Sequence, residues 1–296
     1  MRQAVILIKL LFIFQFQPIA QNDTTINHQI NCPDGDWELV FSEEFNDTTL
    51  NHDRWLTWFP YSDDGSDQCA FCRTHGKEGQ IYRDANVLPD NGILRLIARR
   101  EQGNWLGEQR DYSSGMIHSR QSFGIGKYEV RCRLPVGRGF WPAIWAYGRT
   151  TSELDIMEAG MQRPYRFHMS IHNRKIKKML HRRHCGFKNL SSGFHTYSME
   201  WDTNFIRFYI DSHVVWRITP YRSVLGCRIK KCSLRPGRYL TEPVFPPSDE
   251  TLHLILNLAV GNDHTPFTGS PDAETVFPGQ MEIDWIRYYK RKPGSE

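Results

Sequence analysis

The sequence predicts an all-β protein built as a sandwich of two antiparallel sheets. Short apolar or alternating segments recur along most of the chain, and turn residues separate them. None of these segments has the length and the 3.6-residue period of an amphipathic helix, and there is no internal repeat or low-complexity tract. Many short strands divided by turn signals are typical of a two-sheet sandwich.

The clearest strand is the segment 128–134, where apolar residues alternate with charged ones, as expected for a strand with one buried face. Two later segments flank Asp211-Ser212-His213, a turn signal that predicts a hairpin. The segment 58–77 is rich in aromatic, Asp, Gly and Cys residues without a period, and we expect a long loop there. The remaining predicted strands are 37–41, 93–98, 143–147, 154–157, 167–171, 196–201, 205–210, 214–218, 252–260 and 281–289.

The N-terminal end differs from the rest of the chain. Arg2 and Lys9 accompany a short apolar run, and Ala20 is a small residue before Gln21, which together predict a secretory signal peptide. We therefore expect a secreted or periplasmic protein, and no later segment is long and apolar enough to span a membrane. The predicted parts are a signal peptide at 1–20, a polar lead-in at 21–36, one folded domain at 37–290 and a polar tail at 291–296.

All seven cysteines follow the predicted signal peptide. Export exposes them to an oxidising compartment, so disulfides are expected, and the odd number leaves at least one thiol unpaired. The pairing cannot be deduced from the sequence. The pairs Cys69/Cys72 and Cys227/Cys232 could instead hold zinc together.

The segment 152–158 carries three carboxylates among apolar residues. On a strand, Glu153 and Asp155 share one face and the apolar residues point into the core. Glu158 is five residues from Glu153 and would face the core, but one extra residue accommodated as a β-bulge around 156–157 brings it back to the other two. The sequence thus predicts three acids in a row on one face of a strand.

Adjacent like charges oppose ionisation, so at least one of these carboxyls should have a raised pKa. Glycoside hydrolysis uses such a set: one carboxylate as nucleophile and one carboxylic acid that protonates the leaving oxygen, about 5–5.5 Å apart when configuration is retained. A solvated strand face and a metal site are the alternatives that the pattern alone leaves open.

The segment Glu153-Leu-Asp155-Ile-Met-Glu158 resembles glycoside hydrolase family 16, in the branch with a bulged catalytic strand that includes laminarinases, agarases and carrageenases. Gly139-Phe-Trp141-Pro-Ala-Ile-Trp145 closely resembles the cleft-lining stretch of that family. Further segments resemble it in family order, namely 41–46, 112–119, 127–135, 195–201, 256–261 and 281–289.

The resemblance implies a β-jelly-roll of two curved antiparallel sheets, concanavalin A-like, with an open cleft. It also implies an endo-acting, retaining hydrolase of a β-linked polysaccharide, either a glucan or a galactan, which needs no cofactor for catalysis. By motif position, Glu153 would be the nucleophile, Asp155 its helper and Glu158 the acid/base.

Other residues match family positions with a second, structural explanation. Trp141 and Trp145 would pack against sugar rings or belong to the core. His172 would form a hydrogen bond near the reacting sugar or be an ordinary surface histidine, and Asn257 would bind sugar hydroxyls or stabilise the strand ladder. Asp284 aligns with a position that helps to hold a structural calcium ion away from the cleft.

The distribution of charge bears on the substrate. Removing Arg2 and Lys9 lowers the formal net charge from +4 to +2, but the stretch 161–199 contains no Asp or Glu and many basic residues. In the family fold the basic middle of this stretch is expected to be a loop that borders the cleft, where it would attract an anionic substrate. An acidic or sulfated galactan is therefore expected, against the simpler explanation of a solvated basic loop. The basic residues in its middle are Arg174, Lys175, Lys177, Lys178, Arg182, Arg183 and Lys188.

Two departures from the usual β-1,3-glucanase pattern, at 148–152 and 261–264, also argue for another sugar. Nucleic acid is a poor partner, because no aromatic platform accompanies the basic residues. We expect a monomer. A lectin-like module without turnover and a transglycosylase of the same fold are the competing functions, and the intact carboxylates favour an enzyme over a pure binder.

Overall fold

The computed structural model describes residues 37–62, 64–148, 152–186, 189–220, 222–223, 227–228, 231–232, 244–265 and 267–293. The predicted signal peptide and polar lead-in lie outside these residues, as does part of the departure at 148–152. The first described strand begins at Trp37 and the last ends at Arg291. The division of the chain into leader, domain and tail stays a prediction.

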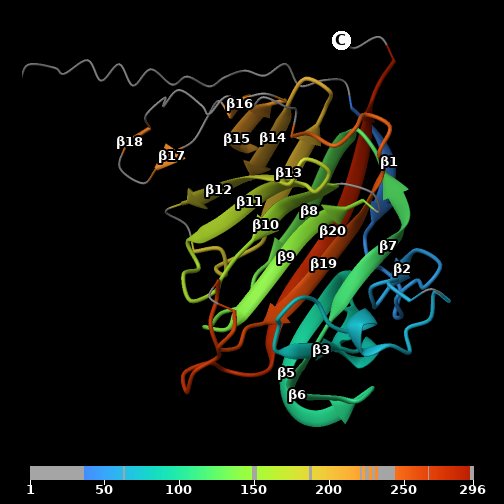
Figure 1. The fold of residues 1–296 in the computed structure, drawn as a ribbon, viewed down its shortest axis with the longest axis vertical. Helices are drawn as coiled ribbons and strands as arrows, with labels where there is room; N and C mark the ends of the chain where they lie inside the picture. The colour runs from blue at the N-terminus through green and yellow to red at the C-terminus, as the bar shows by residue number, and fades with distance from the viewer. Residues whose placement is uncertain are drawn as a thin grey trace, which may run out of the picture. The chain divides into compact units, whose positions relative to one another are not determined.

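The described residues form two large sheets that are antiparallel except for one strand pair (Figure 1). The first sheet has eleven strands, and nine of them lie in the order β16 (Arg222–Ser223), β15 (His213–Thr219), β14 (Ile206–Ile210), β13 (His195–Trp201), β8 (Gly126–Arg133), β20 (Gly279–Arg291), β5 (Ile93–Trp105), β6 (Glu108–Ser114) and β3 (Gln80–Tyr82). Its other two strands, β1 (Trp37–Glu43) and β4 (Val87–Asp90), pair with β20 and β5.

The second sheet has seven strands in the order β12 (Lys178–Cys185), β11 (Arg166–Asn173), β10 (Ser152–Glu158), β9 (Phe140–Tyr147), β19 (Leu252–Val260), β7 (Met116–Phe123) and β2 (Trp55–Leu56). A small separate pair is formed by β17 (Cys227–Arg228) and β18 (Lys231–Cys232). The helical segments of the described chain are two short 3-10 turns, η1 (Ala70–Cys72) and η2 (Asp84–Asn86). The predicted all-β sandwich is confirmed.

One hydrophobic core joins the two large sheets. Val130 and Met199 come from the first sheet, Ile144 and Leu256 come from the second, and all four are fully buried in the same cluster. Such a shared cluster requires the sheets to pack face to face, with alternate residues of each strand pointing inward. The opposite face of the second sheet is therefore free to carry polar groups.

The predicted bulge is present in β10. Asp155 lies opposite Ser170 of β11, and Glu158 lies opposite His168, so three steps along β10 match two along β11. Ile156 and Met157, the residues in this irregular stretch, are both buried in the core. The bulge keeps the apolar residues inside while it returns Glu158 to the outer face.

The predicted hairpin is also present, between β14 and β15. Ile210 pairs with His213, which leaves Asp211 and Ser212 as the two turn residues. Their φ angles are 47° and 66°, and positive φ at both central residues is the geometry that matches the twist of a tight hairpin.

The prediction of a loop in the basic stretch is partly wrong. A strand, β12, runs from Lys178 to Cys185 and pairs with β11 along its whole length. Leu180 packs against the core from one side of this strand. The alternation was hidden in the sequence because the remaining positions on both faces are mostly basic.

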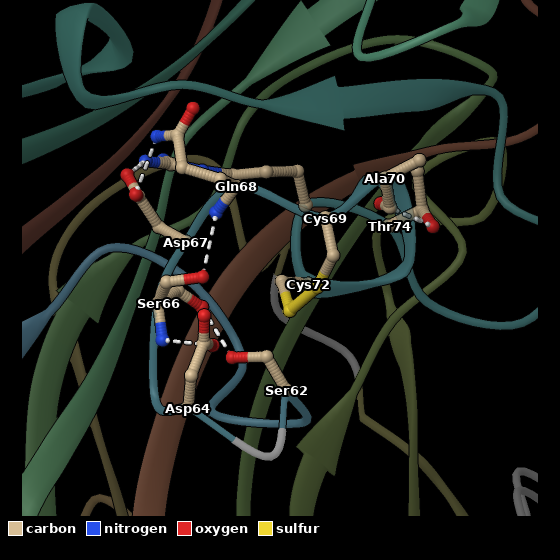
Figure 2. Close-up of a disulfide and its surroundings, with 10 residues drawn as sticks. Ser62, Asp64, Ser66, Asp67, Gln68, Cys69, Ala70, Cys72 and Thr74 are labelled. Atoms are coloured by element: carbon tan, nitrogen blue, oxygen red, sulfur yellow. Dashed lines mark hydrogen bonds and ion pairs between the residues drawn. A yellow bond between two sulfur atoms is a disulfide. The ribbon is translucent and has the colours of Figure 1, made fainter.

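Cys69 and Cys72 form a disulfide in the long loop before β3, shown in Figure 2, so this pair is not a zinc site. Cys132 and Cys185 are free thiols, of which Cys132 is buried in β8. Cys32 and the side chains of the other two cysteines lie outside the described residues.

Candidate active site

A cavity of about 220 Å³ opens on the outer face of the second sheet. It brings together all seven residues predicted to be catalytic or sugar-binding, from four neighbouring strands. These residues are Trp141 and Trp145 of β9, Glu153, Asp155 and Glu158 of β10, His172 of β11 and Asn257 of β19. The cavity is completed by Ala143, His75 and Glu78, which the sequence did not single out.

Strand register explains how these side chains meet. Ala143 lies directly opposite Glu158 on one side and opposite Asn257 on the other. Residues opposite each other in adjacent strands point to the same face of the sheet. The small side chain of Ala143 therefore leaves open space between the carboxyl group and the amide.

His172 joins two of the carboxylates. Its Nε2 lies 3.0 Å from Oδ2 of Asp155 and 3.6 Å from Oε1 of Glu153. The hydrogen bond to Asp155 raises the pKa of His172, so the imidazolium is favoured. These three residues also form the one cluster within the described chain whose ligand atoms are close enough to hold a metal ion.

The pKa of Glu153 is raised to about 7, first by burial and then by the negative charge of Asp155. His172 and Arg174 oppose this rise, and the Arg174 guanidinium lies 3.9 Å from Oε2 of Glu153. Both cations stabilise the ionised form of the carboxylate. Glu153 is therefore able to lose its proton near neutral pH.

Glu158 lies in a different environment. Its pKa is raised well above its usual value, mainly by burial and next by the charge of Asp155. A hydrogen bond from Nε1 of Trp141, 3.1 Å long, is the opposing influence. Because Glu153 faces two cations and Glu158 receives one neutral donor, Glu153 loses its proton first. Over a pH range the site holds one carboxylate and one carboxylic acid.

The two tryptophans have different surroundings. Trp141 is half-buried and packs against Phe267, with ring centroids 4.8 Å apart. Trp145 is only 5% exposed and belongs to a second small apolar cluster, so its ring is part of the cavity wall more than a free platform. Its Nε1 donates a 2.8 Å hydrogen bond to Oδ1 of Asn257, which fixes both side chains.

Glu78, like His75, is a polar cavity residue that sequence reasoning missed. A signal was present, because Glu78, Gln80 and Tyr82 alternate and so share one face of an extended segment. The structure connects them: Gln80 Nε2 and the Tyr82 hydroxyl both donate to Oε2 of Glu78, at 2.6 and 2.8 Å. Tyr82 in turn accepts a 2.9 Å hydrogen bond from Nδ2 of Asn257.

Asp284 does not join the cavity. Its carboxylate pairs with Arg131 of the neighbouring strand β8. The binding of a calcium ion at Asp284 stays a prediction. The described residues include no helix long and apolar enough to cross a membrane.

Comparisons with known proteins agree with this site. The model of glycosyl hydrolases family 16 matches residues 77–229. A β-glucanase of Rhodothermus marinus is 31% identical over 86% of this chain and 85% of its own, and a keratan-sulfate endo-1,4-β-galactosidase of Sphingobacterium multivorum is 28% identical over 92% of this chain and 59% of its own.

Among solved structures, the catalytic domain of an endo-1,3-β-glucanase (laminarinase) from Thermotoga petrophila is similar, with a TM-score of 0.69. It is 28% identical, and the match covers 87% of this chain and 99% of that domain. The family match spans more than half of the chain and includes β10 and its carboxylates. The chain therefore belongs to glycosyl hydrolase family 16, as an endo-acting hydrolase of O-glycosyl bonds in β-linked polysaccharides.

Proposed function

We propose that the protein hydrolyses its polysaccharide with retention of configuration, with Glu153 as nucleophile, Asp155 as helper and Glu158 as acid/base. The observation that carries this proposal is the bulge in β10, which places three carboxyls on one face of the sheet in unlike electrostatic surroundings. Retaining glycosidases use two carboxyl groups about 5–5.5 Å apart, one ionised and one protonated. Glu153 and Glu158 lie on the same face of β10, with Asp155 between them, and this placement suits that arrangement.

In the first step, the Glu153 carboxylate attacks the anomeric carbon and the glycosidic C–O bond breaks. The proton of Glu158 passes to the leaving oxygen, so the leaving sugar departs with a hydroxyl group. In the second step, the Glu158 carboxylate takes a proton from water, whose oxygen attacks the same carbon and releases Glu153. Glu158 ends protonated and Glu153 ends ionised, as both began.

Asp155 and His172 would prepare Glu153 for this attack. Asp155 is 4% exposed and has a hydrogen bond with His172 Nε2, which also faces Glu153. The positive charge of the imidazolium offsets the repulsion between the two acids. Trp141 would pack against a sugar ring while its Nε1 holds Glu158, and Asn257 would bind sugar hydroxyls beside Trp145.

We further propose an anionic galactan as the substrate, because the cationic edge of the second sheet extends the carboxylate face. On β12, His181 lies opposite Ser170 and Arg183 lies opposite His168, and these β11 residues in turn lie opposite Asp155 and Glu158. All of them therefore point to the face that carries the cavity. Within the described residues, no carboxylate forms an ion pair with Arg183. The relative that acts on keratan sulfate makes a sulfated galactan a reasonable choice.

A neutral β-1,3-glucan is the second candidate substrate, because the relatives named above include a β-glucanase and a laminarinase. Both candidates use the same three carboxyls. They differ in whether the basic residues of the β11–β12 edge contribute to binding.

The first experiment is a polysaccharide panel analysed by product chromatography, with wild type beside Glu153→Gln. The panel holds laminarin, mixed-linkage glucan, agarose, porphyran, carrageenans and keratan sulfate. We expect oligosaccharides from one substrate class, absent with the variant, and a β-anomer as the first product in proton NMR. An α-anomer as first product would contradict retention, and binding without products would favour a lectin-like module. Longer oligosaccharides made from shorter ones would instead indicate transglycosylation.

The charged edge has its own test. Lys177→Ser combined with Arg183→Ser removes two exposed cations of the basic stretch, and Arg100→Ser with Lys290→Ser removes two exposed cations from the other sheet as the matched control. We expect the first pair to raise KM on the anionic substrate and to flatten its dependence on salt. Equal KM and equal salt dependence in both double variants would exclude the anionic substrate.

Export is part of the proposal, through the predicted signal peptide at 1–20. Expression of the whole chain should give an exported protein that begins at Gln21, as read by N-terminal sequencing. We also propose that the active unit is a monomer, which the elution volume of the purified protein in size-exclusion chromatography would test.

A further inference from the structure

We propose that Glu78 binds hydroxyl groups of the sugar that lies against Trp145 and Asn257, as a fourth carboxyl of the cleft that takes no part in bond cleavage. The inference rests on the proposed function, because it places a sugar beside the three carboxyls of β10. It deepens that function by assigning one subsite and the type of sugar that the subsite accepts.

Glu78 lines the cavity although it is only 7% exposed. A chain of hydrogen bonds runs from its Oε2 through the Tyr82 hydroxyl to Asn257, and from Asn257 to Trp145. The carboxyl group, the amide and the indole are thus one connected unit. A sugar ring bound there would meet an apolar ring and two polar side chains, which is the combination that a sugar requires.

The backbone around Glu78 is fixed from both sides. Gly79 N donates to the carbonyl of Val260, at 2.7 Å, and the backbone N of Val260 donates to Oε1 of Gln80, at 2.6 Å. A side chain at Gly79 would place its Cβ 3.1 Å from the Val260 carbonyl oxygen, closer than nearly all such contacts. The close approach of this segment to the end of β19 holds Glu78 in place, so its carboxyl needs no reorganisation to bind.

One oxygen of this carboxyl remains available. Oε2 accepts two hydrogen bonds, from Gln80 and Tyr82, whereas no described residue forms a hydrogen bond with Oε1. No ion pair with a described cation compensates the group either. Burial raises the pKa of Glu78 to about 7, which shows how poorly the charge is solvated. A buried carboxyl without a cation costs stability, and a sugar hydroxyl would provide the missing partner.

The same position restricts the sugar. An ionised Glu78 repels a sulfate or carboxylate group on the ring beside Trp145, whereas Arg183 lies on the opposite side of the β10 carboxylates. A neutral sugar therefore occupies the subsite of Glu78. Any anionic substituent occupies the side of β11 and β12.

The test compares Glu78→Gln with Glu200→Gln. Glu200 is an equally buried carboxyl, also 7% exposed, which pairs with Arg207 in the other sheet and does not line the cavity. Both substitutions are made in wild type and in the Glu153→Gln background. Affinity electrophoresis through gels that contain laminarin, agarose or keratan sulfate measures binding without turnover.

We expect Glu78→Gln to weaken binding to the retained polysaccharide by about 10- to 100-fold, the usual loss for a hydrogen bond to a charged group. Its melting temperature should equal or exceed that of wild type, whereas Glu200→Gln should melt lower and bind as wild type does. Unchanged binding with Glu78→Gln, or weaker binding with a lowered melting temperature, would overturn the inference. Residual hydrolysis by Glu153→Gln would instead count against the proposed nucleophile, and the binding comparison would still decide the role of Glu78.

Discussion

Trp141 Nε1 donates a hydrogen bond to Oε1 of Glu158, so the same indole group faces the cavity and touches the proposed acid/base. A donor to the carboxylate stabilises its ionised form and lowers its pKa. Trp141→Phe removes that donor and keeps an aromatic ring. We expect the pKa of Glu158 to rise, which moves the alkaline limb of the kcat/KM profile to higher pH. A pH profile from 4 to 10 checks this, and an alkaline limb that stays in place would show that Trp141 does not hold Glu158.

His172→Asn should act on the other limb. The imidazolium lowers the pKa of Glu153, whose ionised form makes the attack. Without it, the pKa of Glu153 rises above about 7, and the acidic limb of kcat/KM moves to higher pH. His213, the exposed first residue of β15 in the other sheet, is the control, and His213→Asn should leave the profile unchanged.

Glu158→Gln separates the acid/base role from simple binding. Loss of a general acid typically costs about 10²- to 10⁴-fold in rate. We expect a loss of this size on the natural substrate, but a much smaller one on an aryl glycoside whose dinitrophenolate departs without a proton. With the Glu158→Ala variant, azide should restore the rate and give a β-glycosyl azide. Equal losses on both substrates would assign Glu158 to another task.

The disulfide between Cys69 and Cys72 should affect substrate binding more than catalysis. Cys72 is fully buried and its carbonyl accepts a 2.9 Å hydrogen bond from the backbone N of Phe59, which packs against Trp145. Because the bridge closes a very short loop, its removal in the Cys69→Ser/Cys72→Ser variant should cost only about 2 kcal/mol. We expect a higher KM, a nearly unchanged kcat and a melting temperature a few degrees lower. A changed kcat with a constant KM would contradict this.

The raised pKa of Glu78 predicts that the stability of the protein depends on pH. Its folded pKa of about 7 lies above the usual value of 4.5, so the native state binds the proton more tightly than the unfolded chain does. The contribution of Glu78 to the free energy of unfolding is therefore fully present below pH 4.5, and it is lost as the pH rises through 7. The difference is on the order of 3 kcal/mol. Urea unfolding should therefore show that wild type loses stability relative to Glu78→Gln between pH 5 and 8. Parallel curves would mean that Glu78 does not titrate in this range.

Much of the site could be predicted because its pattern is local. Glu153, Asp155 and Glu158 lie on one strand, and the alternation of side chains reveals their shared face once one bulged residue is allowed. The placement of the tryptophans came from a continuous motif on the adjacent strand. The roles of all these residues stay predictions that the experiments above test.

The remainder depends on contacts between distant parts of the chain. Glu78 is buried because its segment meets the end of β19, where Val260 bonds to Gln80 across a sequence separation of 180 residues. Nothing near Glu78 in the sequence reveals that meeting. The strand β12 was missed because basic residues conceal the alternation that Leu180 obeys. The pairing of Cys69 with Cys72 required a distance, which composition cannot supply.

In the described part of the chain, β12 is the last strand of its sheet, with β11 on one side only. The outward residues of an edge strand can change without breaking hydrogen bonds to a second strand on its far side. Mutations there would alter which polymers are accepted, while the chemistry on β10, two strands away, stays intact. Because of this separation, natural selection or protein engineering can change the substrate specificity by single substitutions on β12 while the catalytic rate is retained.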